Sequence, residues 1–203
     1  ALRKDYVVYL LSNTNEGYSY NVTGKLEKSF DFGLDLMAAY TYGVSKGVND
    51  GTSSQAYSNW SYNENWRGSN NPEVSYTDFD QPHRIIASAS YKVAYGKNLA
   101  TSIALFYSGN SGSRYSLCYN GDLNKDGVKG NDLIYVPTNS EIDAMIIKPL
   151  TNLPADKQRN DLKAYINSEE SGLKDLQGKY AERNGLITPF EHHFDLRIMQ
   201  DFY

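Results

Sequence analysis

The chain of 203 residues contains little cysteine and histidine and no long apolar run. Its single cysteine, Cys118, excludes an internal disulfide framework. No stretch stays apolar over the ~20 residues that a membrane-spanning helix needs. A formal net charge of −4 gives no basic surface, which argues against nucleic acid as a partner. The sequence also lacks a phosphate-binding loop and a Cys/His pair with catalytic spacing, so we expect no enzymatic activity.

Tyrosine is the abundant aromatic residue, with 18 Tyr against 7 Phe and 2 Trp. Tyrosine suits the boundary between lipid and water because it joins an apolar ring to a hydroxyl group. It is also a good strand former in soluble proteins. The mean hydropathy of −0.60 does not separate these classes, since half of every transmembrane β-strand is polar.

Residues 18–45 alternate between apolar and polar side chains, the period-two pattern of β-strands. The mostly apolar side comprises Tyr18, Tyr20, Val22, Gly24, Leu26, Phe30, Phe32, Leu34, Leu36, Ala38, Tyr40, Tyr42 and Val44. We expect two strands joined by a turn at residues 27–29. Their length exceeds the ~5–6 residues usual in soluble proteins and matches a tilted strand that crosses a bilayer.

The same alternation returns over residues 85–95 and 99–108, which predicts a second hairpin with its turn at residues 96–98. Residues 193–202 predict a fifth strand. Residues 6–11 are apolar without clean alternation and predict a weaker sixth one. The fold class is therefore all-β and antiparallel.

The connections between these strands alternate between short and long. The long ones run over residues 46–81 and 109–188. Outer-membrane barrels have short periplasmic turns and long extracellular loops, so we expect both long connections to be extracellular. Residues 1–203 would then form part of one transmembrane β-barrel domain. Six strands are fewer than the ~8 of the smallest barrels, which predicts a piece of a larger barrel or one chain of a multi-chain barrel.

The second long connection contains an acidic stretch, Asp-Leu-Asn-Lys-Asp-Gly, at residues 122–127. Oxygen-bearing side chains at alternate positions followed by glycine begin a calcium loop. The predicted ligands of Ca²⁺ are Asp122, Asn124, Asp126, the carbonyl of Val128 and Asp132. The site is not an EF-hand, because Leu133 takes the position of the closing glutamate. The alternative is a plain polar turn, which favours the same residue types.

The first long connection is rich in aromatic and amide side chains. Aromatic faces next to amides suit the capture of a sugar or a peptide. The candidate ligand-binding residues are Tyr57, Trp60, Tyr62 and Trp66. Packing between loops is the alternative explanation.

Residues 153–184 are the only stretch with helical spacing of apolar residues, and Pro154 stands where a first helical turn tolerates proline. Elsewhere, Asp78, Asp80, His83 and Arg84 suggest a salt-bridged entry into a strand. His193 and Asp195 share a strand face but are too few for a zinc site.

Four short motifs stand in a fixed order: Pro82-His83-Arg84, then Asn-Asp-Leu-Ile-Tyr-Val-Pro at 131–137, Tyr-Ala-Glu-Arg-Asn-Gly at 180–185, and Asp195-Leu196-Arg197 with Gln200-Asp201-Phe202. From Tyr18 onward the chain thereby resembles the C-terminal barrel region of TonB-dependent outer-membrane receptors. The most similar branch is the Oar-like one of Bacteroidetes and myxobacteria.

This resemblance implies a plugged barrel of about 22 strands in the outer membrane of a Gram-negative bacterium. Such a receptor imports a bulky solute, or handles a peptide or protein, and contacts TonB through a region that precedes this segment. It implies outer-membrane lipid around the wall and a surface lipoprotein or another outer-membrane protein as partner. The family's acidic loop would correspond to Asp122, Asn124 and Asp126.

Three other functions stay open at this point. A passive porin would have the same wall without a plug. A subunit of a secretion or adhesion complex would use the barrel as a scaffold. A secreted soluble protein that binds carbohydrate with the help of calcium would be a β-sandwich without membrane contact.

Overall fold

The structure is a computed structural model that describes residues 8–95 and 97–202. The chain divides into two compact units. The sheet unit comprises Glu16–Gly47, Tyr76–Arg114 and the described residues from Ile187 onward. The connection unit comprises Val48–Ser75 and Tyr115–Leu186, with the described residues before Glu16. No helix among the described residues is long and apolar enough to cross a membrane.

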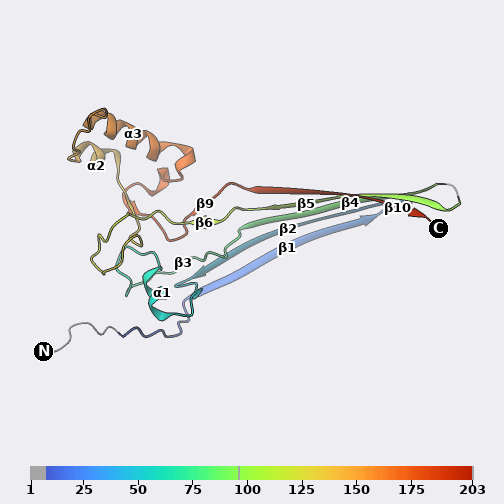
Figure 1. The fold of residues 1–203 in the computed structure, drawn as a ribbon, viewed down its shortest axis with the longest axis horizontal. Helices are drawn as coiled ribbons and strands as arrows, with labels where there is room; N and C mark the ends of the chain where they lie inside the picture. Colours follow the sequence, from blue (N-terminus) through green and yellow to red (C-terminus); the bar gives the residue numbers. More distant parts are fainter. Residues whose placement is uncertain (1–7, 96, 203) are drawn as a thin grey trace. The chain divides into compact units, whose positions relative to one another are not determined.

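The sheet unit is one antiparallel sheet with strand order β1-β2-β4-β5-β10, and Figure 1 shows these strands side by side. The strands are β1 (Gly17–Ser29), β2 (Leu34–Gly47), β4 (His83–Tyr95), β5 (Leu99–Asn110) and β10 (Glu191–Phe202). Among the described residues, β1 and β10 are each paired along one edge, so the sheet is open. The predicted antiparallel β-architecture is thus confirmed.

The register of the sheet aligns the apolar side chains of all five strands. Leu26 of β1 lies opposite Ala38, which is followed across the sheet by Ala87, Tyr107 and Phe194 of β10. One residue further along each strand, Met37, Ser88, Phe106 and Asp195 form the neighbouring row, on the other side. The alternation in the sequence is therefore a property of the whole sheet, with one apolar and one mainly polar face.

The first turn lies at residues 30–33, so its prediction at residues 27–29 was wrong. Gly33 fixes this position because its φ of +91° is one that other residues rarely adopt. A Cβ atom there would also lie 2.5 Å from the Lys92 carbonyl oxygen. The Phe30 N–H donates to the Leu34 carbonyl at 2.8 Å and closes the turn. Phe30 and Phe32 consequently belong to the turn and not to a strand.

Two further sequence predictions concern the ends of strands. The second hairpin is confirmed, since β4 ends at Tyr95 and β5 begins at Leu99. The weak strand at residues 6–11 is wrong for Val8 to Leu11, which form no strand, and residues 6 and 7 lie outside the described residues. The ring of Tyr9 packs instead on Tyr57 and Trp60 of its own unit, with ring centroids 5.2 and 4.9 Å away.

The connection unit contains three α-helices and two 3₁₀ helices among its described residues. They are α1 (Ala56–Ser61), α2 (Asn139–Ala144), α3 (Ala155–Asn167), η1 (Glu169–Ser171) and η2 (Lys174–Leu176), beside the paired strands β7 (Tyr135–Val136) and β8 (Lys179–Tyr180). The prediction of a single helical stretch over residues 153–184 was too simple. Helix α3 ends at Asn167, and α1 and α2 are too short to give a helical period in the sequence.

Among the described residues, the hydrophobic core lies in the connection unit. Val136, Ile142, Ile166 and Leu173 are buried there and pack together. Helix α2 is held at its start by a capping box, in which Thr138 and Glu141 exchange hydrogen bonds. Three two-residue strands at the boundaries of the units complete the fold: β3 (Ser75–Tyr76), β6 (Arg114–Tyr115) and β9 (Leu186–Ile187).

Candidate functional site

The largest candidate surface is the apolar face of the sheet unit. Its exposed large side chains are Tyr18, Tyr20, Val22, Leu26, Leu36, Tyr40, Tyr42, Tyr91, Val93, Tyr95, Ile103, Leu105, Phe194, Leu196, Ile198 and Phe202. Contiguous exposed apolar surface of this kind marks a site of contact with a partner or a membrane.

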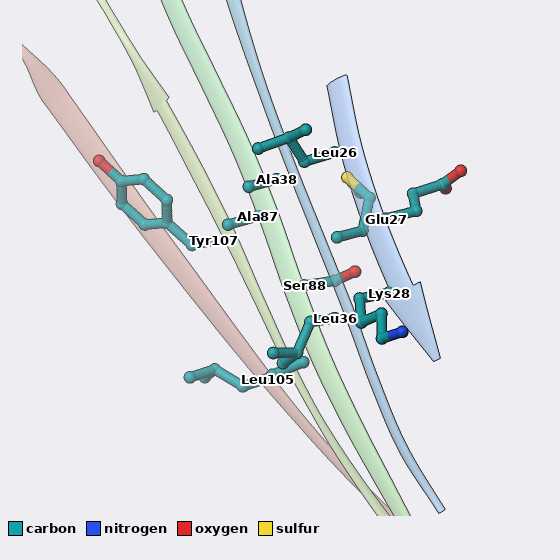
Figure 2. Close-up of a pocket in the computed structure, with 11 residues that line it drawn as sticks. Leu26, Glu27, Lys28, Leu36, Ala38, Ala87, Ser88, Leu105 and Tyr107 are labelled. Carbon is teal, nitrogen blue, oxygen red and sulfur yellow. The ribbon is translucent and has the colours of Figure 1, made fainter. Parts of the chain in front are cut away.

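A hollow of about 550 Å³ lies in this apolar face. Figure 2 shows its floor, where Ala38 and Ala87 lie between Leu26 and Tyr107. These four residues belong to one cross-strand row, so the hollow exists because the two central strands carry alanine where their neighbours carry large side chains. It is a groove across the face and not an enclosed pocket.

Aromatic side chains gather at both ends of the apolar face. At the end where the long connections leave, Tyr20 packs on Tyr42, and the Tyr40 hydroxyl lies 2.8 Å from Nδ1 of His83. At the turn end, Phe32 packs on Tyr91. Strand β4, with 13 residues, spans about 40 Å at roughly 3.3 Å per residue. Tilted by about 45°, it would cover roughly 28 Å of bilayer thickness.

The polar face of the sheet carries charged and hydroxyl groups that pair across strands. Lys92 Nζ donates to Asp201 Oδ2 at 3.0 Å, and the hydroxyls of Thr23 and Thr41 lie 2.8 Å apart. Ile86 and Phe106 are apolar exceptions on this face. One face of the sheet is thus apolar, and the other is mainly polar.

The predicted salt-bridged entry into a strand is confirmed in part: Asp80 forms an ion pair, but its partner is Arg114, a residue outside the predicted set. Arg114 Nε donates to Asp80 Oδ2 at 2.6 Å, and both side chains are buried. The Arg114 guanidinium also lies 3.6 Å from the ring centroid of Tyr76. The second Asp80 oxygen accepts from the Ser45 N–H, so this carboxylate has structural partners on both sides.

Side chains of the acidic loop at residues 122–132 accept hydrogen bonds from backbone N–H groups of the same loop. Asp122 accepts hydrogen bonds from the N–H groups of Asp126 and Gly127, both at 3.1 Å. Asn124 Oδ1 accepts from the Asp126 N–H at 2.9 Å, and Asp126 Oδ1 accepts from the Val128 N–H at 2.9 Å. In the described part of the chain, no three His, Cys, Asp or Glu side chains converge as a metal cluster. The side chains of Asp122, Asn124 and Asp126 thus accept hydrogen bonds from turns of the loop itself.

Two buried oxygens beside this loop have no hydrogen-bond partner among the described residues. One is Oδ1 of Asp132, a residue that is 3% exposed. Its Oδ2 accepts from the Leu123 and Asn124 N–H groups, so the carboxylate points into the loop. The other is Oδ1 of Asn131, whose amide nitrogen donates to Ser69 Oγ at 3.0 Å. Sequence reasoning missed Asn131, although it directly precedes the last predicted ligand.

Hydrogen bonds join the acidic loop to a segment about sixty residues earlier. The Ser69 N–H and hydroxyl both donate to Asp126 Oδ2, at 2.9 and 2.8 Å. The Asn65 N–H donates to the Asn131 carbonyl at 2.8 Å. Burial acts to raise the pKa of Asp126, but the hydrogen bonds that its carboxylate accepts outweigh burial and hold the pKa below its usual value.

The four predicted ligand-binding aromatic residues have different surroundings. Tyr57 and Trp60 pack on each other with ring centroids 6.0 Å apart, and Trp60 Nε1 donates to Asn70 at 2.8 Å. Tyr62 is 77% exposed. Trp66 stacks on Tyr180, a residue outside the predicted set, with centroids 4.5 Å apart and planes 11° from parallel.

Trp66 and Tyr180 line a pocket of about 290 Å³ in the connection unit. The Arg67 guanidinium lies 4.4 Å from the Trp66 ring centroid, and Trp66 Nε1 donates to Glu73 at 3.2 Å. Arg67 and Glu73 form an ion pair at 3.2 Å. The pocket thus combines an aromatic wall with charged groups of both signs, which suits a small polar ligand.

Cys118 is half-buried in the connection unit. Burial, together with the charges of Glu64 and Asp132, raises the pKa of its thiol to about 12. The thiol is therefore protonated at neutral pH, which makes it a poor nucleophile and a poor metal ligand.

Comparison with models of protein families, with curated proteins and with solved structures finds no match for this chain.

Proposed function

We propose that the sheet unit is part of the wall of an outer-membrane β-barrel, in a TonB-dependent receptor similar to the Oar-like branch. One observation carries the proposal: the register aligns the apolar faces of five long strands into one continuous surface. Barrel strands alternate between lipid-facing apolar residues and lumen-facing polar residues, and this sheet has both faces.

The exposure of the apolar face favours lipid as its surroundings. A soluble sheet buries its apolar face against a second layer of structure. Here Phe194, Leu196 and Ile198 are 68, 67 and 65% exposed within the described residues. Contact with acyl chains would remove these side chains from water without any second layer.

The aromatic residues at both ends of the apolar face support the same proposal. Outer-membrane barrels carry girdles of aromatic side chains at both boundaries of the bilayer. Tyr20, Tyr40 and Tyr42 would lie at one boundary and Phe32 and Tyr91 at the other.

The long connections supply the proposed capture function. They start from the same end of the sheet, because His83 lies opposite Tyr42 and Glu191 lies opposite Asn110, which itself pairs with Arg84. In a Gram-negative outer membrane this end would face outward. Extracellular loops would capture a bulky solute, or a peptide or protein, and TonB would then drive movement of a plug. No bond chemistry takes place in this segment.

Adjacent residues with opposite orientations provide a sharp test of the membrane proposal. Spin labels are attached at Leu196→Cys and, as matched control, at Asp195→Cys, each in a Cys118→Ser background of the full-length protein in lipid vesicles. Leu196 and Asp195 point to opposite faces of β10. We expect the label at position 196 to be accessible to oxygen dissolved in the bilayer, and the label at position 195 to a water-soluble nickel reagent. Equal accessibility of both labels to the nickel reagent would contradict the proposal.

A second experiment separates the receptor from its alternatives. We expect the full-length protein in detergent to bind the periplasmic domain of TonB. A passive porin would remain in the membrane fraction without binding TonB. A scaffold subunit would also lack TonB binding and would co-purify with other chains in stoichiometric amounts. A soluble carbohydrate-binding protein would be monodisperse without detergent.

A further inference from the structure

We propose that the loop at residues 122–132 binds one Ca²⁺ ion with Asp132 as its central carboxylate, and that the ion joins the two long connections to each other. This inference is independent of the membrane proposal, since it concerns the connection unit alone.

The Asp132 carboxylate is buried with one of its oxygens unpartnered in the described part of the chain. Its Oδ1 is buried and accepts no hydrogen bond from the described residues. Within the same part of the chain, none of Asp122, Asp126 and Asp132 forms an ion pair. A buried carboxylate oxygen without a partner costs free energy, and a bound cation removes this cost.

The loop groups near Asp132 that could donate electron pairs to a cation are oxygen atoms. The second unpartnered buried atom, Oδ1 of Asn131, is an amide oxygen, and the side chains of Asp122 and Asp126 add carboxylate oxygens that can accept further interactions. Oxygen donors from a flexible loop suit Ca²⁺, which accepts six to eight of them in irregular geometry. Zinc is disfavoured because the loop contains no His and no Cys.

The loop is joined to the other long connection of the chain. Asn65, Ser69 and Asn131 form hydrogen bonds that tie the loop to the preceding connection. Asn65 also precedes Trp66, whose ring stacks on Tyr180. An ion that holds the loop would therefore also stabilise the aromatic pocket, because binding to the folded state alone favours that state.

The test uses the full-length protein, stripped of metal with EDTA, and the probes Ca²⁺ and Tb³⁺. Asp132 lines a pocket of about 270 Å³ together with Trp66, Tyr119 and Tyr135, so these rings should sensitise Tb³⁺ emission that Ca²⁺ then displaces. Calorimetry should give one Ca²⁺ per chain with a Kd on the order of 10⁻⁴ M. Loss of charge in Asp132→Asn should raise the Kd by at least about tenfold. The exposed Asp175→Asn is the matched control and should leave the Kd unchanged.

Limited proteolysis gives a readout that does not depend on the binding signal. Lys125 and Lys129 are exposed trypsin sites within the loop. Ca²⁺ should slow cleavage at both in the parent protein, whereas Mg²⁺ at the same concentration should not. If Asp132→Asn does not fold, Asp122→Asn, which leaves the buried carboxylate in place, should weaken Ca²⁺ binding. Absence of heat and of Tb³⁺ emission at about 10 mM ion, well above the expected Kd, would overturn the proposal, as would a Kd unaffected by the substitution that folds.

Discussion

The connection unit buries several large apolar side chains in a core, whereas the sheet unit leaves large apolar side chains exposed on one face. Of the buried hydrophobic residues among those described, only Ala100 belongs to the sheet unit, whereas Val136, Ile142, Ile166 and Leu173 form a core in the connection unit. The connection unit thus has an interior of its own. The sheet unit has an apolar exterior, which is typical of a surface that contacts a partner or a membrane.

Both units also contain buried polar side chains that bind to other polar groups. In the connection unit, buried Arg183 donates to the Val48 carbonyl at 2.9 Å and to Asn63 Oδ1, so polar groups hold long segments together. In the sheet unit, the pair of Asp80 and Arg114 is buried beside the start of β4. A fold made of long connections needs such specific bonds because it has few regular elements to satisfy its backbone.

The largest effect is expected from Asp80→Asn in the sheet unit. It removes the buried negative charge that faces the Arg114 guanidinium, and breaking a buried pair in this way costs about 3–5 kcal/mol. The matched control, Asp201→Asn, removes the exposed partner of Lys92 and should cost about 0–1 kcal/mol. Urea unfolding in lipid vesicles measures both. Equal losses would mean that burial does not distinguish the two pairs.

The core of the connection unit can be tested with two isoleucines that are four residues apart. Ile142 is completely buried and Ile146 is 98% exposed. Ile142→Ala should destabilise the unit by about 2–5 kcal/mol because it leaves a cavity, and Ile146→Ala should have almost no effect. Amide hydrogen exchange of α3, measured by mass spectrometry, reports the difference. If both substitutions accelerated exchange alike, the connection unit would have no independent core.

An arginine on either face of β5 distinguishes lipid from water around the sheet. Leu105 and Phe106 are similarly exposed, at 45 and 39%, but point to opposite faces. In a bilayer, Leu105→Arg should cost about 2–4 kcal/mol near the midplane. Phe106→Arg is the matched control and should cost little, because Asp195 lies opposite it. Equal and small costs for both, from urea unfolding in vesicles, would indicate that water contacts both faces.

The strands were predictable from the sequence because alternation is a local property of each strand. The turn after β1 was not, since Phe30 and Phe32 continue the alternation while the backbone of Gly33 decides where the chain reverses. The short helices α1 and α2 escaped prediction for a related reason: six residues give fewer than two turns, which is too few for a period.

The candidate site was predictable only in part. The spacing of Asp122, Asn124 and Asp126 identified an acidic loop, but not that these side chains would accept hydrogen bonds from the loop itself. The contribution of Ser69 depends on contact between distant segments, which no local pattern contains. The same holds for the stacking of Trp66 on Tyr180.

The smallest effect is expected at the start of α2, where pH should act through Glu141. Hydrogen bonds from the Thr138 N–H and hydroxyl, and from Tyr135, hold the pKa of Glu141 below its usual value of 4.5. Because the folded state has the lower pKa, this stabilisation is present above pH 4.5 and is lost as the pH falls through the folded pKa.

Exchange of the α2 amides should therefore accelerate below pH 4.5, after correction for intrinsic rates, and Glu141→Gln should remove this pH dependence. Amides of β4 serve as the internal reference in the sheet unit. The cap itself is tested at neutral pH by Thr138→Ala, which should cost about 1 kcal/mol. A pH dependence that survives Glu141→Gln would assign the effect to another acid. Glu141 is exposed and Asp80 is buried. Comparing the two substitutions therefore shows how strongly burial changes the contribution of one carboxylate charge to the free energy of unfolding.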